Sequence, residues 1–236
     1  MEPAGLSSRY GARRLCDSDV GAVYRLSAGN PIFYKYCPPC VTLESIREDM
    51  KVLPPGKSGE DKFYVGFFDG SMLTAVMDLI LKYPNDETAF IGLFMVDSAS
   101  QGKGTGTAII EECLCFLKRQ GLRRARLGFA KGNCQSEAFW TKNGFVRTGE
   151  EVNNGSYTAV GDGKGAVTRA KAGGYKKRSA RPESGKIKSG MYHTSPIFNS
   201  KRTDGHSGLS ADPAAGRAGA SLYRMSCVRS STWSSS

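Results

Sequence analysis

The sequence has no apolar stretch long enough to cross a lipid bilayer. Its longest apolar run is residues 90–96, whereas a membrane-spanning helix needs about 20 apolar residues. Residues 1–15 contain arginines but no apolar run after them, so they do not resemble a secretory signal peptide. Apolar residues make up 39% of the chain, below the usual range of about 45–50%. We therefore expect a soluble, cytoplasmic protein with no membrane partner, part of which lies outside any core.

Histidine is scarce, and the cysteines follow no regular spacing. The chain has 2 His and 7 Cys, an odd number that does not fit a disulfide framework. Cys37-Pro38-Pro39-Cys40 has the spacing of half a zinc site, but neither a second such pair nor a nearby His completes it. We interpret it as a reduced thiol pair in a loop and expect no metal.

Acidic residues become rare after residue 160. Residues 161–236 contain 14 Lys and Arg against 4 Asp and Glu, so nearly all of the net charge of +11 lies there. This segment is rich in Gly and Ser and has no sustained period of 2 or 3.6 residues. Such a composition cannot bury enough apolar surface to offset its chain entropy. We expect residues 1–160 to form a domain and residues 161–236 a disordered basic tail.

Two hypotheses account for this tail. A last strand begins at residues 157–160 and then meets Gly161-Asp162-Gly163, so it has about four residues where a strand has about 5–6. A frameshift near Val160 would explain this interruption, and the tail would then be an out-of-frame product. A genuine tail would instead be able to contact nucleic acid through Lys176-Lys177-Arg178.

The first half of the domain predicts two short helices followed by a meander of strands. A strand is expected at residues 9–15, then helices at 17–26 and 43–50, the first capped by Asp17 or Ser18. Aromatic and β-branched residues then predict strands, which we place at 63–68, 72–81 and 88–96. Asp69-Gly70 between the first two is a favoured hairpin turn.

The period changes after residue 97. Ile109, Cys113, Phe116 and Leu117 form one helical stripe, which predicts a helix at 104–120. A strand at 125–129 follows, so the order strand, helix, strand implies a parallel crossover. A helix at 136–142 and a strand from 145 complete the pattern. The expected fold class is α/β (α+β), with a mixed, mostly antiparallel central sheet and flanking helices.

The segment Gln101-Gly102-Lys103-Gly104-Thr105-Gly106 lies between the buried strand at 88–96 and the following helix. Glycines let backbone N–H groups approach an anion, and the start of a helix adds free amides and a positive dipole end. The spacing fails the P-loop pattern, and no third Gly or Ala completes a dinucleotide fingerprint. A glycine-rich turn that only starts a helix remains the simplest alternative.

This segment resembles the acetyl-CoA loop of the GNAT superfamily of N-acetyltransferases, Gln/Arg-x-x-Gly-x-Gly/Ala. Asn133 and the run at residues 138–145 resemble the second segment of that family, an Asn followed by a short helix that ends in aromatic-x-x-x-Gly-Phe. The order of predicted elements matches as well, so the resemblance covers residues 9–160. It implies a GNAT-like fold and acetyl-CoA as cosubstrate.

The resemblance also implies roles for particular residues in holding acetyl-CoA. The amides of residues 101–106, namely Gln101, Gly102, Lys103, Gly104, Thr105 and Gly106, would hold the pyrophosphate. The strand edge at Phe94, Met95 and Val96 would lie along pantetheine, and the amide of Val96 would polarise the thioester carbonyl as an oxyanion hole does. Asn133 would bind the pantetheine arm, although it would equally serve as the N-cap of the next helix.

For catalysis, the resemblance implies direct attack of an amine on the thioester. Trp140 stands where many relatives have a Tyr that protonates the leaving thiolate, and an indole has no such proton to give. We therefore expect Trp140 to pack against the cofactor or the core. Asp78 and Glu87 are the candidate bases, and the alternative for each is an exposed carboxylate at a strand end.

The sequence does not identify the acceptor amine. In this family acceptor specificity resides in the first two helices and their loop, here residues 17–55, and in the later strands. Because a Tyr is absent at Trp140, a non-catalytic acyl-CoA-binding module or pseudoenzyme is the alternative to an N-acetyltransferase.

Overall fold

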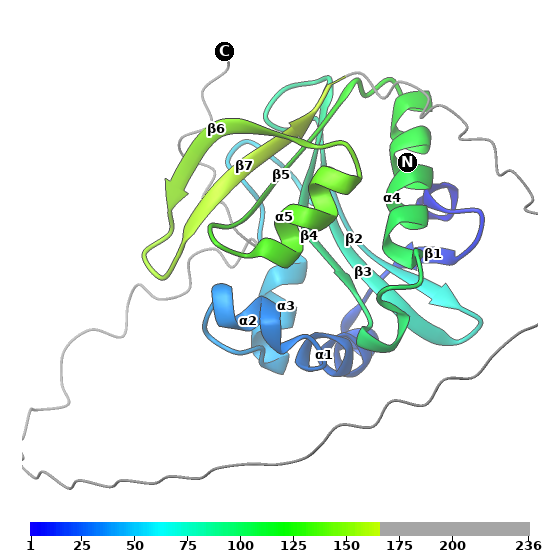
Figure 1. The fold of residues 1–236 in the computed structure, drawn as a ribbon. Helices are drawn as coiled ribbons and strands as arrows, with labels where there is room; N and C mark the ends of the chain where they lie inside the picture. The colour runs from blue at the N-terminus through cyan, green and yellow to red at the C-terminus, as the bar shows by residue number, and fades with distance from the viewer. Residues whose placement is uncertain (166–236) are drawn as a thin grey trace, which may run out of the picture. The chain divides into compact units, whose positions relative to one another are not determined.

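The computed structural model describes residues 1–165 of the chain (Figure 1). Within them lies one seven-stranded sheet with helices on both faces. The hypotheses on a disordered tail, on a frameshift product and on nucleic-acid contact through Lys176-Lys177-Arg178 concern residues that lie outside the described part, apart from residues 161–165.

The strands of the sheet are β1 (Gly11–Arg14), β2 (Lys62–Asp69), β3 (Met72–Leu81), β4 (Thr88–Val96), β5 (Arg124–Ala130), β6 (Val146–Asn153) and β7 (Thr158–Lys164). The α-helices are α1 (Val20–Ala28), α2 (Pro31–Tyr36), α3 (Leu43–Lys51), α4 (Thr105–Arg119) and α5 (Cys134–Lys142). Short 3₁₀ turns are η1 (Pro3–Leu6), η2 (Asp17–Asp19) and η3 (Ser98–Ser100).

The strand order is β1-β2-β3-β4-β5-β7-β6. All neighbouring strands are antiparallel except β4 and β5, which are parallel and joined by the crossover helix α4. The fold class predicted from the sequence is therefore confirmed. The predicted meander corresponds to β2, β3 and β4. Its first turn is Gly70-Ser71, one residue later than the predicted Asp69-Gly70, because Asp69 still pairs with Met72, and Gly70 has φ 58°.

Each face of the sheet has its own core. On one face, Ile109, Cys113 and Leu117 of α4 pack with Trp140 and with alternate residues of the central strands. On the other face, Val23 of α1 and Ile46 of α3 are buried against the sheet. Figure 1 shows α1, α2 and α3 gathered in one group, with α4 standing beside the sheet. The nearly continuous apolar run of β4 follows from this burial on both faces.

The last strand corrects a prediction. We expected it to stop after Val160, but β7 continues to Lys164 and pairs with β5 on one side and β6 on the other. Gly161 and Gly163 have no side chains to pack, yet both pair with β5 and Gly163 also pairs with β6. The carbonyl oxygen of Gly161 accepts from Oγ1 of Thr148 at 3.1 Å. The side chain of Asp162 is buried and lies 3.6 Å from Nε of Arg147. The predicted domain end at residue 160 therefore falls inside this strand.

The sequence did not predict α2, which begins at Pro31 directly after the end of α1. Proline is favoured at the first position of a helix, where its missing N–H has no intrahelical partner in any case.

Among residues 1–165, no helix has both the length and the apolar character needed to cross a membrane.

Candidate functional site

A cavity of about 280 Å³ opens where β4 ends and α4 begins. It is bounded by the end of β4, the loop that follows, the first turn of α4, the helix α5, and the turn between α1 and α2. The described residues that line it are Asn30, Phe33, Phe94, Met95, Val96, Ser100, Gln101, Gly102, Gly104, Thr105, Gly106, Thr107, Asn133, Gln135, Ser136, Phe139, Trp140 and Lys142. Lys142 is the one charged residue in this set.

The conformation of the loop requires glycine at two positions. Gly102 has φ 72° and Gly104 has φ 84°, a backbone region that L side chains rarely adopt. A Cβ at either position would meet no atom within 4 Å, so the requirement is conformational and the space in front of the backbone is open. Gly104 is the N-cap of α4, and the amides at the start of a helix have no intrahelical acceptor. Both features favour an anion at this place.

Gly106 has a different role because it lies inside the first turn of α4. A Cβ there would be 3.0 Å from the ring of Phe139 and 3.3 Å from a methyl group of Val96. The absence of a side chain therefore lets α4 pack closely against both α5 and the end of β4.

The strands β4 and β5 separate after four residue pairs. Their parallel register runs from Thr88 opposite Arg124 to Ile91 opposite Leu127, and a bulge in the β3–β4 ladder follows. The edge of β4 beyond Ile91 is thus exposed toward the cavity. Separation of two central strands is unusual, because it leaves main-chain N–H and C=O groups of β4 pointing into the gap without a strand to pair with.

The β3–β4 register identifies which groups face that opening. The amide of Asp97 donates to the carbonyl oxygen of Thr74 at 2.8 Å, so these two form a hydrogen-bonded pair. Because such pairs alternate along antiparallel strands, the main-chain groups of Phe94 and Val96 point away from β3 and toward the gap. The carbonyl oxygen of Val96 accepts from Nδ2 of Asn30 at 3.2 Å and from Nε2 of Gln101 at 3.0 Å.

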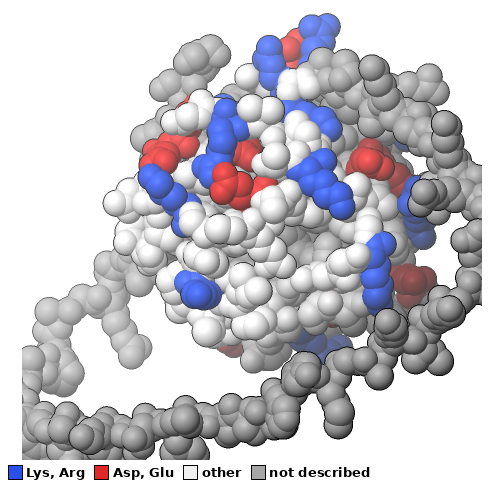
Figure 2. All heavy atoms as spheres, viewed as in Figure 1, with Lys and Arg blue, Asp and Glu red and all other residues white. Residues whose placement is uncertain are grey.

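A cluster of aromatic side chains lies along the wall of the cavity formed by β4 and α5. The rings of Phe94 and Phe139 are stacked with centroids 5.8 Å apart, and Trp140 lies 4.9 Å from Phe139 and 5.1 Å from Phe145. Trp140 is 6% exposed and belongs to the core under α4 while it also lines the cavity. Figure 2 shows largely uncharged surface across the middle of this face of the domain, with Lys and Arg toward its edges.

Most cofactor residues proposed from the sequence lie together in this cavity. Lys103 is the exception, since it is exposed on the loop and does not line the cavity. Asn133 is the N-cap of α5, since its Oδ1 accepts from the amide of Ser136 at 3.1 Å, and the residue also lines the cavity. Its Nδ2 remains the donor that could reach a bound molecule.

The two candidate bases lie in very different places. Asp78 is not an exposed strand-end carboxylate, because it is 3% exposed on β3 and accepts from Nζ of Lys62 at 2.8 Å. Burial raises the pKa of Asp78, while Lys62 opposes the shift. Oδ2 of Asp78 would lie 2.9 Å from a Cβ on Gly92, so this carboxylate packs over β4 where β4 and β5 separate.

Glu87 precedes β4 at the opposite end from the loop. It forms ion pairs with Arg123 and Arg124 at 3.2 and 3.8 Å. The nine residues of β4 separate it from the loop, or about 30 Å at the usual rise per residue. The structure does not bring Glu87 to the cavity.

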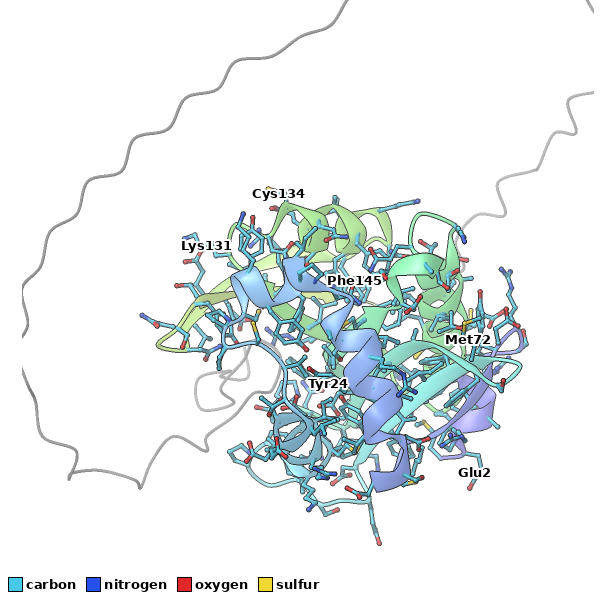
Figure 3. The ribbon with its side chains drawn as sticks, turned by 90° about the horizontal axis from the view of Figure 1, so that it is seen from below. Glu2, Tyr24, Met72, Lys131, Cys134 and Phe145 are labelled. Carbon is cyan, nitrogen blue, oxygen red and sulfur yellow. The ribbon has the colours of Figure 1, made fainter. Side chains whose placement is uncertain are left out.

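Sequence reasoning missed several residues that line the cavity, chiefly Asn30, Phe33, Gln135, Phe139 and Lys142. Phe139 and Lys142 lie within the run that carried the family resemblance. For Asn30 and Phe33, the sequence contains only the Asn-Pro turn between two helices. Cys134 is exposed at the start of α5, and Figure 3 places it at the outer edge of the domain, with Phe145 toward the interior.

Comparison with known proteins agrees with this geometry. Residues 34–145 match the model of the Acetyltransferase (GNAT) family. No curated protein sequence matches the chain significantly.

Similar solved structures include an acetyltransferase from Thermus thermophilus, with 22% identity, a TM-score of 0.54 and coverage of 66% of this chain and 96% of that one. A Salmonella typhimurium acetyl transferase that modifies the N-terminal serine of the 50S ribosomal subunit protein L7/L12 has 18% identity and a TM-score of 0.53, covering 68% and 96%. RimL, a ribosomal L7/L12 alpha-N-protein acetyltransferase in complex with coenzyme A, has 18% identity and a TM-score of 0.52, again covering 68% and 96%. At these identities the similarity establishes the fold alone.

Proposed function

We propose that this chain transfers the acetyl group of acetyl-CoA to a primary amine of a small molecule or protein, because residues 34–145 match the model of the GNAT family of acetyltransferases. One observation carries the proposal. A glycine loop at a helix start and the exposed edge of a separated strand face the same cavity. The first suits a pyrophosphate and the second suits an amide-containing chain such as pantetheine.

Acetyl-CoA would bind in an extended arrangement across this cavity. The amides of residues 101–106 would hold the pyrophosphate at the positive end of α4. The main chain of Phe94 would hydrogen-bond to the pantetheine arm as a strand would, and Asn133 would donate to it from the other side. A solved structure of RimL contains coenzyme A, which supports this cosubstrate for a protein of the same fold.

The reaction would proceed by direct transfer. The neutral amine attacks the thioester carbon, a C–N bond forms, and the carbonyl oxygen carries the negative charge of the tetrahedral intermediate. The N–H of Val96 would donate to that oxyanion. Collapse of the intermediate breaks the C–S bond and releases coenzyme A thiolate, and a base takes the proton from nitrogen. Since a thiol has a pKa of about 8.5, the thiolate can leave near neutral pH without an acid at Trp140.

Asp78 is the base that we propose. It packs over Gly92, where β4 and β5 separate, and its raised pKa brings it closer to the working pH of a base. Asp78→Asn should lower kcat by about 10²–10⁴, the usual contribution of a general base, while the affinity for acetyl-CoA is retained. An unchanged kcat in a folded Asp78→Asn variant would remove Asp78 from the mechanism.

The cofactor site is tested by calorimetry of acetyl-CoA binding to the full chain and to two glycine variants. Gly104→Glu places a carboxylate at the proposed pyrophosphate site. Gly121→Glu is the matched control, because Gly121 has φ 86° and open space around it but lies at the other end of α4. We expect Gly104→Glu to abolish binding and Gly121→Glu to preserve it. Equal binding by both variants would exclude the loop as the site.

A non-catalytic acyl-CoA-binding module is the second candidate function. The described residues that line the cavity include neither Asp, Glu nor His, and Trp140 replaces the expected Tyr. Release of free thiol from acetyl-CoA in the presence of an amine panel separates the two functions. Micromolar binding of acetyl-CoA without thiol release, for every amine tested, would favour the binding module.

A further inference from the structure

A second hollow lies on the face of the sheet that carries α1 and α3. It has a volume of about 270 Å³ and is formed by the end of β1, the start of β2 and the end of α3. Three cationic side chains line it, Arg14, Lys51 and Lys62, and no acidic residue is among its described lining residues. Three cations around one small hollow repel each other, so an anion between them would be stabilised.

Lys62 is buried in the wall of this hollow. It is 3% exposed, and its Nζ donates to Oδ2 of Asp78 at 2.8 Å. An ammonium group has three N–H donors, so this bond leaves it capacity for a ligand. Asp78 and Asp49 of α3 are the nearby carboxylates: burial raises the pKa of Tyr64, and the charges of Asp49 and Asp78 add to the shift. Even with both carboxylates counted against the three cations, one positive charge remains in excess.

Arg14 is held in a fixed position at the rim. Its guanidinium lies 3.9 Å from the centre of the Phe63 ring, and Nη1 donates to the carbonyl oxygen of Lys62 at 2.6 Å. The remaining N–H groups of a planar guanidinium match the two oxygens of a carboxylate. A side chain that is already oriented loses less entropy when it binds such a group.

The rest of the hollow is apolar. Leu15, Met50 and Leu53 contribute side chains, and the ring of Tyr64 forms part of the wall. A purely anionic ligand such as phosphate would leave these groups without contacts. The volume is slightly below the usual range of about 300–1,000 Å³ for pockets that hold drug-sized ligands, so the ligand must be small.

We propose that this hollow is a binding site for a small carboxylate with an apolar body. The carboxylate contacts Arg14, Lys51 and Lys62, and the apolar part contacts Leu15, Met50 and Leu53. This site shares no lining residue with the acetyl-CoA cavity among those the structure describes. Its wall residue Lys62 is the ion-pair partner of Asp78, the base proposed above.

The first test is calorimetry of the full chain with two probes of nearly equal shape, phenylacetate and phenylacetamide. Both carry the same apolar ring, but only phenylacetate is charged. We expect phenylacetate to bind at least tenfold more tightly than phenylacetamide, and inorganic phosphate to bind more weakly than phenylacetate. Addition of saturating acetyl-CoA should leave phenylacetate binding unchanged.

The second test uses matched charge-removing variants. Arg14→Gln/Lys51→Gln removes two cations from the hollow, whereas Arg123→Gln/Lys131→Gln removes two exposed cations elsewhere on the domain. We expect the first pair to weaken phenylacetate binding at least tenfold and the second to leave it unchanged. Lys51→Gln alone serves if loss of the Arg14 contacts impairs folding, and it should weaken binding severalfold.

Three results would overturn the proposal. Equal binding of phenylacetate and phenylacetamide would show that the hollow does not recognise the carboxylate. Equal effects of the two double variants would assign the attraction to net charge rather than to this hollow. Displacement of phenylacetate by acetyl-CoA would place the probe in the other cavity.

Discussion

Nε2 of Gln101 donates to Oδ1 of Asn30 at 2.6 Å, although 71 residues of sequence separate the two. Both side chains also donate to the carbonyl oxygen of Val96. One carbonyl at the end of β4 thus joins the glycine loop to the turn between α1 and α2. The helices on one face of the sheet and the loop on the other side of the strand are therefore coupled by three polar contacts.

Substitution of Asn30 should weaken the hydrogen bonds that join the glycine loop to the turn between α1 and α2. Asn30→Ala removes the donor and the acceptor and leaves Gln101 and the Val96 carbonyl to find other partners. We expect the free energy of unfolding to fall by about 1–3 kcal/mol, the cost of leaving such groups unsatisfied, and acetyl-CoA binding to weaken about tenfold. Urea denaturation and calorimetry measure the two effects. Asn153→Ala is the control, because Asn153 is exposed in the β6–β7 hairpin, and an equal effect of both changes would contradict the role of these hydrogen bonds.

Because Lys62 and Asp78 form a buried ion pair, the effects of substituting them on the free energy of unfolding should be strongly non-additive. Lys62→Met leaves a buried carboxylate without its partner and should cost about 3–5 kcal/mol of stability. In the double variant Lys62→Met/Asp78→Leu both charges are gone, and we expect most of that loss to be recovered. Urea unfolding of the single and double variants gives the coupling free energy. A double variant as unstable as the sum of the two singles would show that the ion pair has no energetic coupling.

Asp19 should contribute stability that is lost in acid. Its hydrogen bond from Arg13 lowers the pKa of Asp19 well below the ordinary value of 3.8. The folded protein therefore binds the proton less readily than the unfolded chain does. This contribution is fully present above pH 3.8 and is lost as the pH falls below that value toward the lowered pKa. Asp19→Asn should have a shallower decline of Tm between about pH 5 and pH 2 than the unchanged chain; parallel declines would refute the assignment.

The cysteines of α4 should differ in reactivity. Cys113 is buried, and burial raises the pKa of its thiol to about 12, whereas Cys115 is exposed two residues away. Since the thiolate is the reactive form, Ellman's reagent at about pH 8 should modify Cys115 in the native protein and leave Cys113 unmodified. Peptide mapping by mass spectrometry identifies the modified residue, with guanidinium-treated protein as the control. Modification of both at equal rates would show that α4 opens readily.

The sequence allowed many residues that line the cavity between β4 and α4 to be predicted where they are local in sequence. The glycine loop, the end of β4 and the run around Trp140 each carry their information within a few residues. Periodicity then placed α4 between two parallel strands, which brings these segments to one end of the sheet. Positive φ at Gly102 and Gly104 is the physical reason that the loop pattern is recognisable at all.

Other features depend on contacts that no local pattern contains. Asn30 reaches Gln101 only because α1 ends beside β4, so its short Asn-Pro turn carries no sign of the role. For Asp78, a candidate base, the alternative of an exposed strand-end carboxylate is wrong, because pairing with Lys62 across β2 and β3 allows it to be buried. Side-chain patterning also failed for β7, because backbone pairing with β5 sustains the strand through Gly161 and Gly163, and pairing with β6 resumes at Asp162 and Gly163.

Only four residue pairs join β4 to β5, and this short ladder divides the sheet into two parts. Four antiparallel strands lie on one side of this junction and three on the other, and one short ladder joins their main chains. The core under α4 packs side chains of both parts together. A molecule that hydrogen-bonds along the free edge of β4 would add main-chain bonds at this junction, and its binding would raise the melting temperature by mass action.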